Sequence, residues 1–395
     1  MSLTEEQKKI LRSTAPMFQQ YGKEITSIIY KHMFAAHPEL LDIFNRTNQK
    51  TGTQPFALAN TMYLVIEHLD NLDVLLPQIL LICHKHRALS VQPKHYPILE
   101  KYLLLAIDEF LGGTSDPEML NAWCAAYRLL TGIFIETEKK LYAELGSKQD
   151  QGFIPFTIIN KETIANGPIV AFTFERADGR DLYKYHSGQY ITVRIKKDGH
   201  YHNRHYSLTQ PFDGKTYSIA IKEEIEREPK GLVSTEIITN YKKGDTILLS
   251  LPAGSYALID NAEYHLFIAG GIGITALASM ILDLHQQNKS DIVTLIHCVK
   301  TEDHAAFADQ MREILPENQY HLLVQGGHLL QATIEQILKP EAHVYVCGSG
   351  SFMDKAEEYL AQCRHPHSQI HINAYQPSLS LVKNAVKNQS HTKSI

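Results

Sequence analysis

The sequence predicts three folded parts in succession: an all-α part, a small antiparallel β-barrel and a doubly wound α/β part built on a parallel sheet. Apolar residues recur at helical spacing up to about Leu145, and nothing in this stretch reads convincingly as a strand. From Phe153 to about Ile259, short β-branched runs are separated by turns that contain Gly or Pro. From His265 onward, apolar strands alternate with helical segments. A chain of 395 residues is in any case too long for a single core.

The overall composition is that of a soluble globular protein, with 44% hydrophobic and 21% charged residues. A formal net charge of −5 gives no electrostatic basis for binding nucleic acid or an anionic membrane. The N-terminus reads as a helix start with Ser2 and Glu5 as capping-box residues, and it lacks the apolar core of a signal peptide. No later apolar run approaches the ~18 residues of a membrane span. We therefore expect a cytoplasmic monomer with no nucleic-acid partner and no stable membrane association.

The cysteines are scattered and include no Cys-x-x-Cys pair. They are Cys83, Cys124, Cys298, Cys347 and Cys363. This spacing argues against an iron–sulfur cluster, a zinc ribbon and a disulfide framework.

In the helical part, residues 1–146, breaks are expected at Pro38, Pro77, Pro93 and Gly112-Gly113. The polar, glycine-bearing segment Gly146–Gly152 then makes a linker. The stretch between the breaks should form long helices, each with one apolar face.

Four polar residues fall on the apolar faces of these helices. At about 100° per residue, His86 shares a stripe with Ile79, Ile82, Cys83 and Leu89, whereas His84 points roughly opposite. Gln54 and Leu58 begin a stripe that continues through Val65, and Tyr30 lies among Ile25, Ile28, Ile29, Met33 and Phe34. Glu138 lies at the edge of the stripe Trp123, Tyr127, Leu130, Phe134 and Leu141, whereas Glu136 faces away. A lone histidine on such a face is more often a hydrogen-bonded core residue than a ligand. Buried Tyr, Gln, His and Glu must nevertheless satisfy one another or a bound group.

The barrel part, residues 153–259, contains clear strands at 191–195 and 247–249. Its most informative run is Arg204 to Thr209, in which Arg204 offers a cation for a phosphate, Tyr206 a ring to stack on a flat cofactor and Ser207 a small hydroxyl.

Two further signals in the barrel part are weaker. Tyr190 precedes a strand, where core packing is the alternative. Gly231 and Ser234 lead into the helical-looking 235–239, and a simple helix cap is the alternative to a phosphate contact.

The third part, residues 263–377, has strands at 266–269, 292–296 and 344–347. After the first strand, Gly270, Gly271 and Gly273 open a helix at 276–284, so a pyrophosphate could approach the backbone at the positive end of the helix dipole. The spacing is not the usual Gly-x-Gly-x-x-Gly, and a tight strand-to-helix turn is the alternative. Residues 378–395 are polar and aperiodic and should form a loose tail.

Taken together, these motifs describe an electron path from a nicotinamide to a flavin. From Phe153 to Pro377 the chain resembles the ferredoxin–NADP reductase family, an FAD barrel followed by a nicotinamide domain. The resemblance implies that Arg204 binds the FAD phosphate, that Tyr206 stacks on the isoalloxazine and that Ser207 sits near its N5 edge. Asn373 stands where the family usually has an acidic residue, and Tyr375 can stack over the flavin. The flavin and nicotinamide contacts assigned in this way are Tyr190, Arg204, His205, Tyr206, Ser207, Gly231, Val233, Ser234, Gly270, Gly271, Gly273, Thr275, Cys347, Gly348 and Tyr375.

The helical part resembles the haem domain of flavohaemoglobins, which combine a globin with such a reductase. The resemblance is carried by Tyr30, the runs Pro38-Glu39-Leu40 and Ile43-Phe44-Asn45, Asn48-Gln49, Gln54, Leu58, Lys85-His86, Tyr96 and Glu138. It implies that His86 ligates the haem iron and that Tyr96 and Glu138 form a hydrogen-bonded relay onto it. Phe44, Leu58 and Lys85 would belong to the haem pocket, with Tyr30 and Gln54 on the distal side. Because Pro55 follows it, Gln54 should lie at the helix cap.

The resemblance implies an NAD(P)H-dependent nitric oxide dioxygenase that converts nitric oxide and dioxygen to nitrate. Its cofactors would be haem b, FAD and NADH or NADPH, with electrons passing from NAD(P)H to FAD to haem. A carboxylate on an iron-bound histidine raises the basicity of that histidine and favours oxygen activation over reversible carriage. Two alternatives remain: a haem-based sensor of dioxygen or nitric oxide, and a flavin reductase of ferric iron or hydroperoxides.

Overall fold

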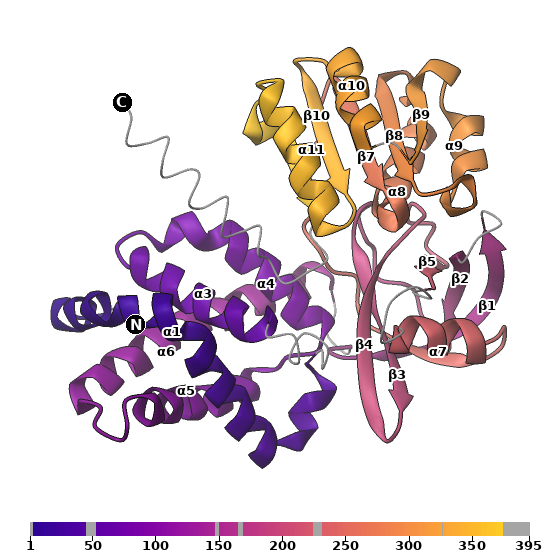
Figure 1. Ribbon diagram of the computed structural model, residues 1–395. Coiled ribbons are helices and arrows are strands. Elements are labelled where there is room, and N and C mark those ends of the chain that lie inside the picture. The colour runs from indigo at the N-terminus through magenta and orange to yellow at the C-terminus, as the bar shows by residue number, and fades with distance from the viewer. Residues whose placement is uncertain are drawn as a thin grey trace. The chain divides into compact units, whose positions relative to one another are not determined.

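The computed structural model describes residues 3–44, 53–146, 150–164, 169–223, 231–325 and 327–373. The chain divides into two compact units (Figure 1). Unit 1 comprises Met1–Gly152, Lys196–Asn203 and Gln376–Ile395, and unit 2 comprises Phe153–Ile195 and Arg204–Tyr375.

Unit 1 is built from helices, drawn in indigo and purple in Figure 1. They are α1 (Glu5–Ala36), η1 (Pro38–Asp42), α3 (Thr53–Glu67), η2 (Leu72–Leu75), α4 (Leu76–Ala88), η3 (Pro93–His95), α5 (Tyr96–Phe110) and α6 (Pro117–Glu144). The predicted breaks are confirmed, because Pro38, Pro77 and Pro93 stand in the first turn of a new helix, where the missing N–H costs nothing. Gly112 and Gly113 adopt φ of +70° and +75° in the turn after α5, a region that favours glycine.

The predicted capping box at the N-terminus is wrong. Thr4, not Ser2, is the N-cap: its Oγ1 accepts from the Gln7 N–H at 3.2 Å, and Gln7 Oε1 accepts from the Thr4 N–H at 3.0 Å. Glu5 is the first helical residue and so cannot be the third-position partner of a cap. Ser2 lies outside the described residues.

The core of unit 1 lies between α1, α3, α5 and α6. At Gly22 a side chain would come within 2.7 Å of the Ala59 Cβ, so the missing side chain lets α1 and α3 pack closely. Trp123 is fully buried and stacks on Phe18, with ring centroids 4.0 Å apart, and its Nε1 donates to Thr14 Oγ1 at 3.1 Å. The predicted stripe of α6 is confirmed, because its five apolar residues and Glu138 are all buried.

The first part of unit 2 is a six-stranded antiparallel sheet in the order β4-β3-β6-β1-β2-β5. Its strands are β1 (Ile154–Ile164), β2 (Ile169–Arg176), β3 (Tyr190–Lys197), β4 (His200–Ser207), β5 (Tyr217–Lys222) and β6 (Thr246–Leu249), with helix α7 (Leu232–Asn240) between β5 and β6. The predicted strands at 191–195 and 247–249 are confirmed.

The second part of unit 2 is a parallel sheet in the order β11-β10-β7-β8-β9. Its strands are β7 (Tyr264–Gly270), β8 (Val293–Val299), β9 (Tyr320–Val324), β10 (Ala342–Cys347) and β11 (Ile370–Asn373). Its helices are α8 (Ile274–Gln286), α9 (Ala308–Ile314), α10 (Gly327–Ile337) and α11 (Gly350–Gln362). Both faces of the sheet carry an apolar core, one shared with α8 and α9 and the other with α10 and α11 (Figure 1).

The doubly wound prediction is therefore confirmed. The first strand of this sheet, β7, lies in its middle, between β8 and β10. The strand order reverses at β7, and ligands of such sheets bind beyond the carboxyl ends of the strands at this point. Those ends are Gly270 and Cys347, which places the two predicted glycine motifs side by side. No helix within the described part of the chain is both long and apolar enough to cross a membrane.

Candidate functional sites

The most developed polar site of unit 1 joins three helices through His86. The His86 Nδ1 lies 2.8 Å from Glu138 Oε1 and 3.0 Å from the Tyr96 hydroxyl. The Tyr96 hydroxyl in turn donates to the same Glu138 oxygen at 2.5 Å. The structure thus brings together the three residues that the sequence assigned to one relay, from α4, α5 and α6.

The protonation of this site follows from its partners. A carboxylate oxygen accepts only, so the His86 Nδ1 must carry the proton, and Nε2 is then the nitrogen with the lone pair. Burial, with the negative charge of Glu138 next, raises the pKa of Tyr96, so its hydroxyl stays protonated and donates. The Glu138 side chain is only 6% exposed, whereas that of His86 is 26% exposed. The His86 ring is therefore held through Nδ1 by Glu138 and Tyr96, and Nε2, on the opposite edge of the ring, carries the lone pair.

Phe134 belongs to this site, although the sequence placed it only in the core. Its ring meets the His86 ring edge-on, with centroids 5.4 Å apart and planes at 90°. It precedes Glu138 by one helical turn, so both side chains project from the same face of α6 toward His86. Phe134 is part of the predicted apolar stripe of α6, but that stripe was interpreted as core packing alone.

The single-stripe interpretation of α4 was incomplete. His84, expected opposite the stripe, is itself buried, as are Arg87 and Ala88. Because α4 is covered on more than one side, a one-sided periodicity does not describe its burial. Burial, with the nearby Arg87 charge second, lowers the pKa of His84 to about 4, which keeps it neutral. Lys85 is partly buried, and this burial lowers the pKa of its amine to about 8.

A second cluster of unit 1 surrounds Tyr30. Its ring stacks on Phe34 and meets Phe44 edge-on, with centroids 5.6 Å apart in both pairs. Tyr30 is 6% exposed, and burial raises the pKa of its hydroxyl, so the phenol is a donor at any physiological pH. Leu58 lies on α3 and is partly buried. Gln54 lies inside the first turn of α3, which begins at Thr53, so the expected cap position is wrong, because proline at the third helical position is compatible with a first turn. The Gln54 side chain lies outside the described residues.

In the antiparallel sheet, Arg204, His205, Tyr206 and Ser207 occupy the end of β4. Alternation along the strand places Arg204 and Tyr206 on one face and His205 and Ser207 on the other. The His205 Nδ1 pairs with Thr192 Oγ1 at 2.8 Å, and its ring lies 4.9 Å from that of Tyr190 on β3. His205 and Tyr190 are thus brought together by adjacent strands, while Ser207 is buried.

Helix α7 begins at Leu232 with Gly231 as its N-cap, three residues before the expected helical segment at 235–239. The Ser234 hydroxyl donates to the Gly231 carbonyl at 3.1 Å, so its proton is committed within the turn. Val233 and Ser234 are both buried. At the other end of α7, the Lys161 ammonium donates to the carbonyls of Ile238 and Tyr241, at 2.6 and 2.7 Å. This cation contacts the negative end of the α7 dipole, and no side chain caps the N-terminal end at Gly231.

The glycine turn after β7 is formed largely by backbone packing. A side chain at Gly273 would stand 2.2 Å from the Cys347 carbonyl oxygen, and one at Gly270 or Gly348 would stand 2.6 Å from the Phe352 ring. Gly271 instead has open space around it but a φ of +53°. Gly273 is therefore required by the Cys347 backbone at the end of β10, whereas Gly270 and Gly348 make room for the Phe352 ring of α11.

Two predicted side-chain contacts of this region have internal partners. The Thr275 hydroxyl donates to the Ile272 carbonyl at 2.9 Å, within its own turn. The Cys347 Sγ lies 3.9 Å from the Asn373 carbonyl oxygen at the end of β11. Tyr375 lies outside the described residues.

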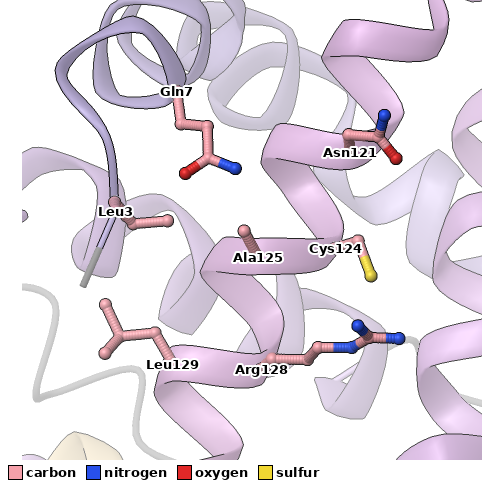
Figure 2. Close-up of a pocket in the computed structure, with 7 residues that line it drawn as sticks. All are labelled: Leu3, Gln7, Asn121, Cys124, Ala125, Arg128 and Leu129. Carbon is pink, nitrogen blue, oxygen red and sulfur yellow. The ribbon is translucent and has the colours of Figure 1, made fainter. Parts of the chain in front are cut away.

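A hollow of unit 1 lies elsewhere, between the start of α1 and α6 (Figure 2). It encloses about 460 Å³, and its lining includes Gln7, Cys124 and Arg128. Arg128 makes two hydrogen bonds to the Glu100 carboxylate, at 2.9 and 2.7 Å, and the Cys124 Sγ lies 3.5 Å from it. Arg128 and Cys124 are thus engaged with Glu100, and the lining contains none of the residues assigned to a site. No group of three His, Cys, Asp or Glu side chains in the described ranges could hold a metal ion.

Comparison with known proteins covers nearly the whole chain. The Globin family model matches residues 27–133, and the oxidoreductase NAD-binding domain model matches residues 267–358. The flavohaemoprotein of Halalkalibacterium halodurans is 35% identical over 96% of this chain and 98% of its own length. Flavohaemoprotein A of Dictyostelium discoideum is 33% identical over 95% and 99%. The chain belongs to the flavohaemoprotein family.

Solved structures agree with the fold of this flavohaemoprotein. The crystal structure of the flavohaemoglobin of Malassezia yamatoensis contains bound FAD and haem. Its superposition covers 95% of this chain and 100% of the Malassezia chain, with a TM-score of 0.85 at 24% identity. The FAD/NAD-binding domain of a nitric oxide dioxygenase from Vibrio cholerae covers 56% of this chain, and 97% of it is covered, with a TM-score of 0.50 at 25% identity. The order of a globin fold, an antiparallel flavin sheet and a parallel nucleotide sheet is therefore that of the family.

Proposed function

We propose that this flavohaemoprotein is an NAD(P)H-dependent nitric oxide dioxygenase, which converts nitric oxide and dioxygen to nitrate. Haem b would be held in unit 1, and FAD with NADH or NADPH in unit 2. When bound, the haem supplies an iron that activates dioxygen, and the flavin converts a two-electron hydride donor into a source of single electrons. The observation that carries the proposal is the contact of His86 with Glu138 and Tyr96, in a chain whose family pairs a globin with a reductase.

The donor set of His86 fits a haem iron. Iron binds the lone pair of a neutral imidazole, and the Glu138 carboxylate fixes the tautomer that leaves Nε2 unprotonated. The same carboxylate pulls on the Nδ1 proton and makes the imidazole a stronger electron donor. The Tyr96 hydrogen bond holds Glu138 in place, so His86 keeps one orientation. This arrangement favours oxygen activation over simple carriage.

Tyr30 is the residue proposed to act on the substrate side. Its protonated hydroxyl can donate to an oxygen atom that carries partial negative charge, and the rings of Phe34 and Phe44 hold it in an apolar setting. Gln54 would be a second donor, and Phe44, Leu58 and Lys85 would line the pocket.

The N-termini of α7 and α8 fit the phosphates of FAD and of the dinucleotide. Gly231 leaves the start of α7 without a side-chain cap, and Gly273 does the same for α8. Backbone N–H groups at such positions bind phosphate. We propose that Arg204 adds a cation at the flavin phosphate, that Tyr190, His205, Tyr206 and Ser207 contact the flavin, and that Tyr375 completes its stacking.

We further propose that the chain works as a monomer in the cytoplasm, with three domains. These are a haem domain at 1–146, a flavin domain at 153–259 and a nicotinamide domain at 263–377, followed by a tail at 378–395. The mixed charge of the chain and the separate apolar cores of the helical part and of the parallel-sheet part support this proposal.

A stopped-flow experiment with two variants tests the function. Wild-type protein reduced anaerobically and mixed with dioxygen and nitric oxide should form nitrate with turnover of NAD(P)H. Arg204→Ala and Ser207→Ala should slow haem reduction by NAD(P)H and leave dithionite-reduced protein able to bind dioxygen. A wild-type protein that binds both gases but forms no nitrate would instead favour the sensor. Equal damage to both readouts in the variants would mean that these residues support folding.

A further inference from the structure

His297 is a buried polar residue within the apolar strand β8. It is fully buried, and its neighbours in the strand include Leu295, Ile296 and Val299, which are buried as well. A buried polar side chain is normally retained because it has hydrogen-bond partners. Its partners therefore show what the histidine does.

One partner lies in the glycine turn that starts the dinucleotide site. The His297 Nε2 lies 3.2 Å from the Gly271 carbonyl oxygen. This oxygen also accepts from the backbone N–H of Ile274, the first residue of α8. His297 thus contacts the turn at its left-handed residue, where φ is +53°.

The Gly271 carbonyl fixes the tautomer of the His297 ring, and the second partner, Tyr320, fits that tautomer. A carbonyl oxygen only accepts, so Nε2 must carry the proton and Nδ1 must be the acceptor. The Tyr320 hydroxyl lies 3.5 Å from Nδ1, on neighbouring strand β9. Burial raises the pKa of Tyr320 to about 12, so its hydroxyl keeps its proton and can donate. Burial also lowers the pKa of His297 to about 4, so the ring stays neutral.

The geometry of a peptide bond converts this contact into an orientation. In a trans peptide the carbonyl of one residue and the N–H of the next point in opposite directions. Because His297 draws the Gly271 carbonyl toward β8, the Ile272 N–H is directed away from β8. The Gly271–Ile272 peptide follows the carboxyl end of β7, where phosphates of a dinucleotide bind in this kind of sheet.

We propose that His297, supported by Tyr320, is a positioning residue for the dinucleotide: it holds the Gly271–Ile272 peptide so that its N–H faces the phosphates. The proposal rests on the assignment of this turn to NAD(P)H and goes beyond it, because no side chain that the sequence assigned to the nicotinamide site lies on β8. His297 does not touch the ligand and acts through the backbone.

Equilibrium binding of the oxidised dinucleotides to oxidised full-length protein tests the proposal without turnover. NAD⁺ and NADP⁺ are titrated calorimetrically into wild type, and the better-bound one is then used with each variant. His297→Phe preserves ring volume but removes the donor, and its Kd should rise about threefold to tenfold, the value of one neutral hydrogen bond. His297→Gln keeps an N–H donor and a carbonyl acceptor and should stay within about twofold of wild type. Tyr320→Phe should weaken binding by about twofold, because the donor to Gly271 remains.

His265→Phe is the matched control. His265 is another buried histidine of the same sheet, on β7, where its ring stacks with Phe267 and Tyr345. The Kd of the dinucleotide for His265→Phe should match that for wild type. All variants should keep the FAD absorbance spectrum. In steady state, His297→Phe should raise KM for NAD(P)H more than it lowers kcat.

Three outcomes would overturn the proposal: His297→Phe binding within twofold of wild type, His265→Phe weakening binding equally, or glutamine failing to restore it. If His297→Phe does not fold, His297→Leu, which also lacks the donor, takes its place, with the same expected rise in Kd and with His297→Gln as its near-wild-type counterpart. Wild-type protein that binds neither dinucleotide would contradict the proposed function itself, whereas wild-type binding with an indifferent His297→Phe contradicts only the role of His297.

Discussion

The two best-defined candidate sites of this flavohaemoprotein are constructed in opposite ways. Around His86 the structure gathers polar side chains from three helices inside an apolar core. Around Gly271 it removes side chains, so that backbone groups of two strand ends approach each other and the start of α8. The first site is specified by which side chains are present, and the second by which are absent.

The difference reflects the chemistry that each site must supply. An iron needs a lone pair of defined basicity, and only a side chain with a tuned partner provides it. A pyrophosphate needs several donors in a fixed array, and backbone N–H groups provide these without rotamer freedom. Substitutions at the first site should therefore change ligand chemistry with modest effects on folding, whereas substitutions at the second should change stability first.

The largest effect is expected for His86→Ala. Without its nitrogen ligand, unit 1 should lose its haem completely, while unit 2 keeps FAD because the two units have separate cores. The haem-to-flavin absorbance ratio of purified protein measures this. His84→Ala is the control, and it should retain haem. The reverse result would show that the apolar stripe of α4 identified the wrong histidine.

At the glycine turn, Gly273→Ala and Gly271→Ala should differ in stability. The new methyl group at Gly273 would meet the Cys347 carbonyl at 2.2 Å, where only backbone can yield, and should cost about 3 kcal/mol of unfolding free energy. At Gly271 no atom lies within 4 Å, so only the left-handed conformation is strained, at about 1 kcal/mol. Urea unfolding followed by FAD fluorescence compares them. Equal costs would mean that the close approach of β7 and β10 relaxes easily.

In the helical unit, Tyr30→Phe should alter ligand chemistry with little loss of stability. Loss of a hydrogen bond to a partly charged oxygen, worth about 1.5–3 kcal/mol, should speed dioxygen release about tenfold to a hundredfold. Flash photolysis or stopped-flow displacement measures this rate. Nitrate formation should fall most at low oxygen, and FAD reduction should be unchanged. Tyr102→Phe, at another buried tyrosine of unit 1, is the control. If Tyr30 is only a core aromatic, its variant will release dioxygen within about twofold of wild type.

The smallest effect is expected for His265→Phe, which should stabilise unit 2. His265 is 1% exposed, and within the described part of the chain its Nδ1 has no hydrogen-bond partner. A phenyl ring in its place should add about 1 kcal/mol at pH 7 by removing that unsatisfied group.

The gain from His265→Phe should grow as the pH falls. Burial, with His343, Lys289 and His371 adding positive charge, lowers the pKa of folded His265 to about 4, below its unfolded value of about 6.5. The unfolded chain therefore takes up a proton first, and the wild type loses stability between about pH 6.5 and pH 4. Unfolding midpoints measured at pH 7 and pH 5 check this. A variant with unchanged acid sensitivity would show that other groups dominate it.

Local pattern predicted most of the fold because backbone geometry imposes it. The 3.6-residue period of α6 placed Glu138 inward and Glu136 outward, and both are found so. The capping box was misplaced because Ser2–Glu5 and Thr4–Gln7 have the same spacing. Only the packing of α1 decides which pair begins the helix.

The candidate site was recovered in part, and the missed residues share a physical cause. His297 is a polar residue in an apolar strand, and Phe134 is one of several aromatic residues on α6. The sequence does not say which residue each of them contacts. His297 reaches Gly271 across neighbouring strands. Phe134 reaches His86 only because α4 packs against α6. A polar residue inside an apolar strand is a signal that the sequence does carry, but it marks His265 as well as His297.

By itself the sequence determined the order of the three parts, the prolines and glycines that separate the helices of unit 1, and the faces that carry His86, Tyr30 and Glu138. These features depend on the 3.6-residue helical period and on the backbone preferences of proline and glycine, which act between residues close in the sequence. The tertiary structure alone decided that His86 Nδ1 meets a carboxylate 52 positions away, and that Gly273 packs on the Cys347 carbonyl. Such contacts depend on how helices and strands pack, and packing is set by the summed fit of many side chains rather than by any motif.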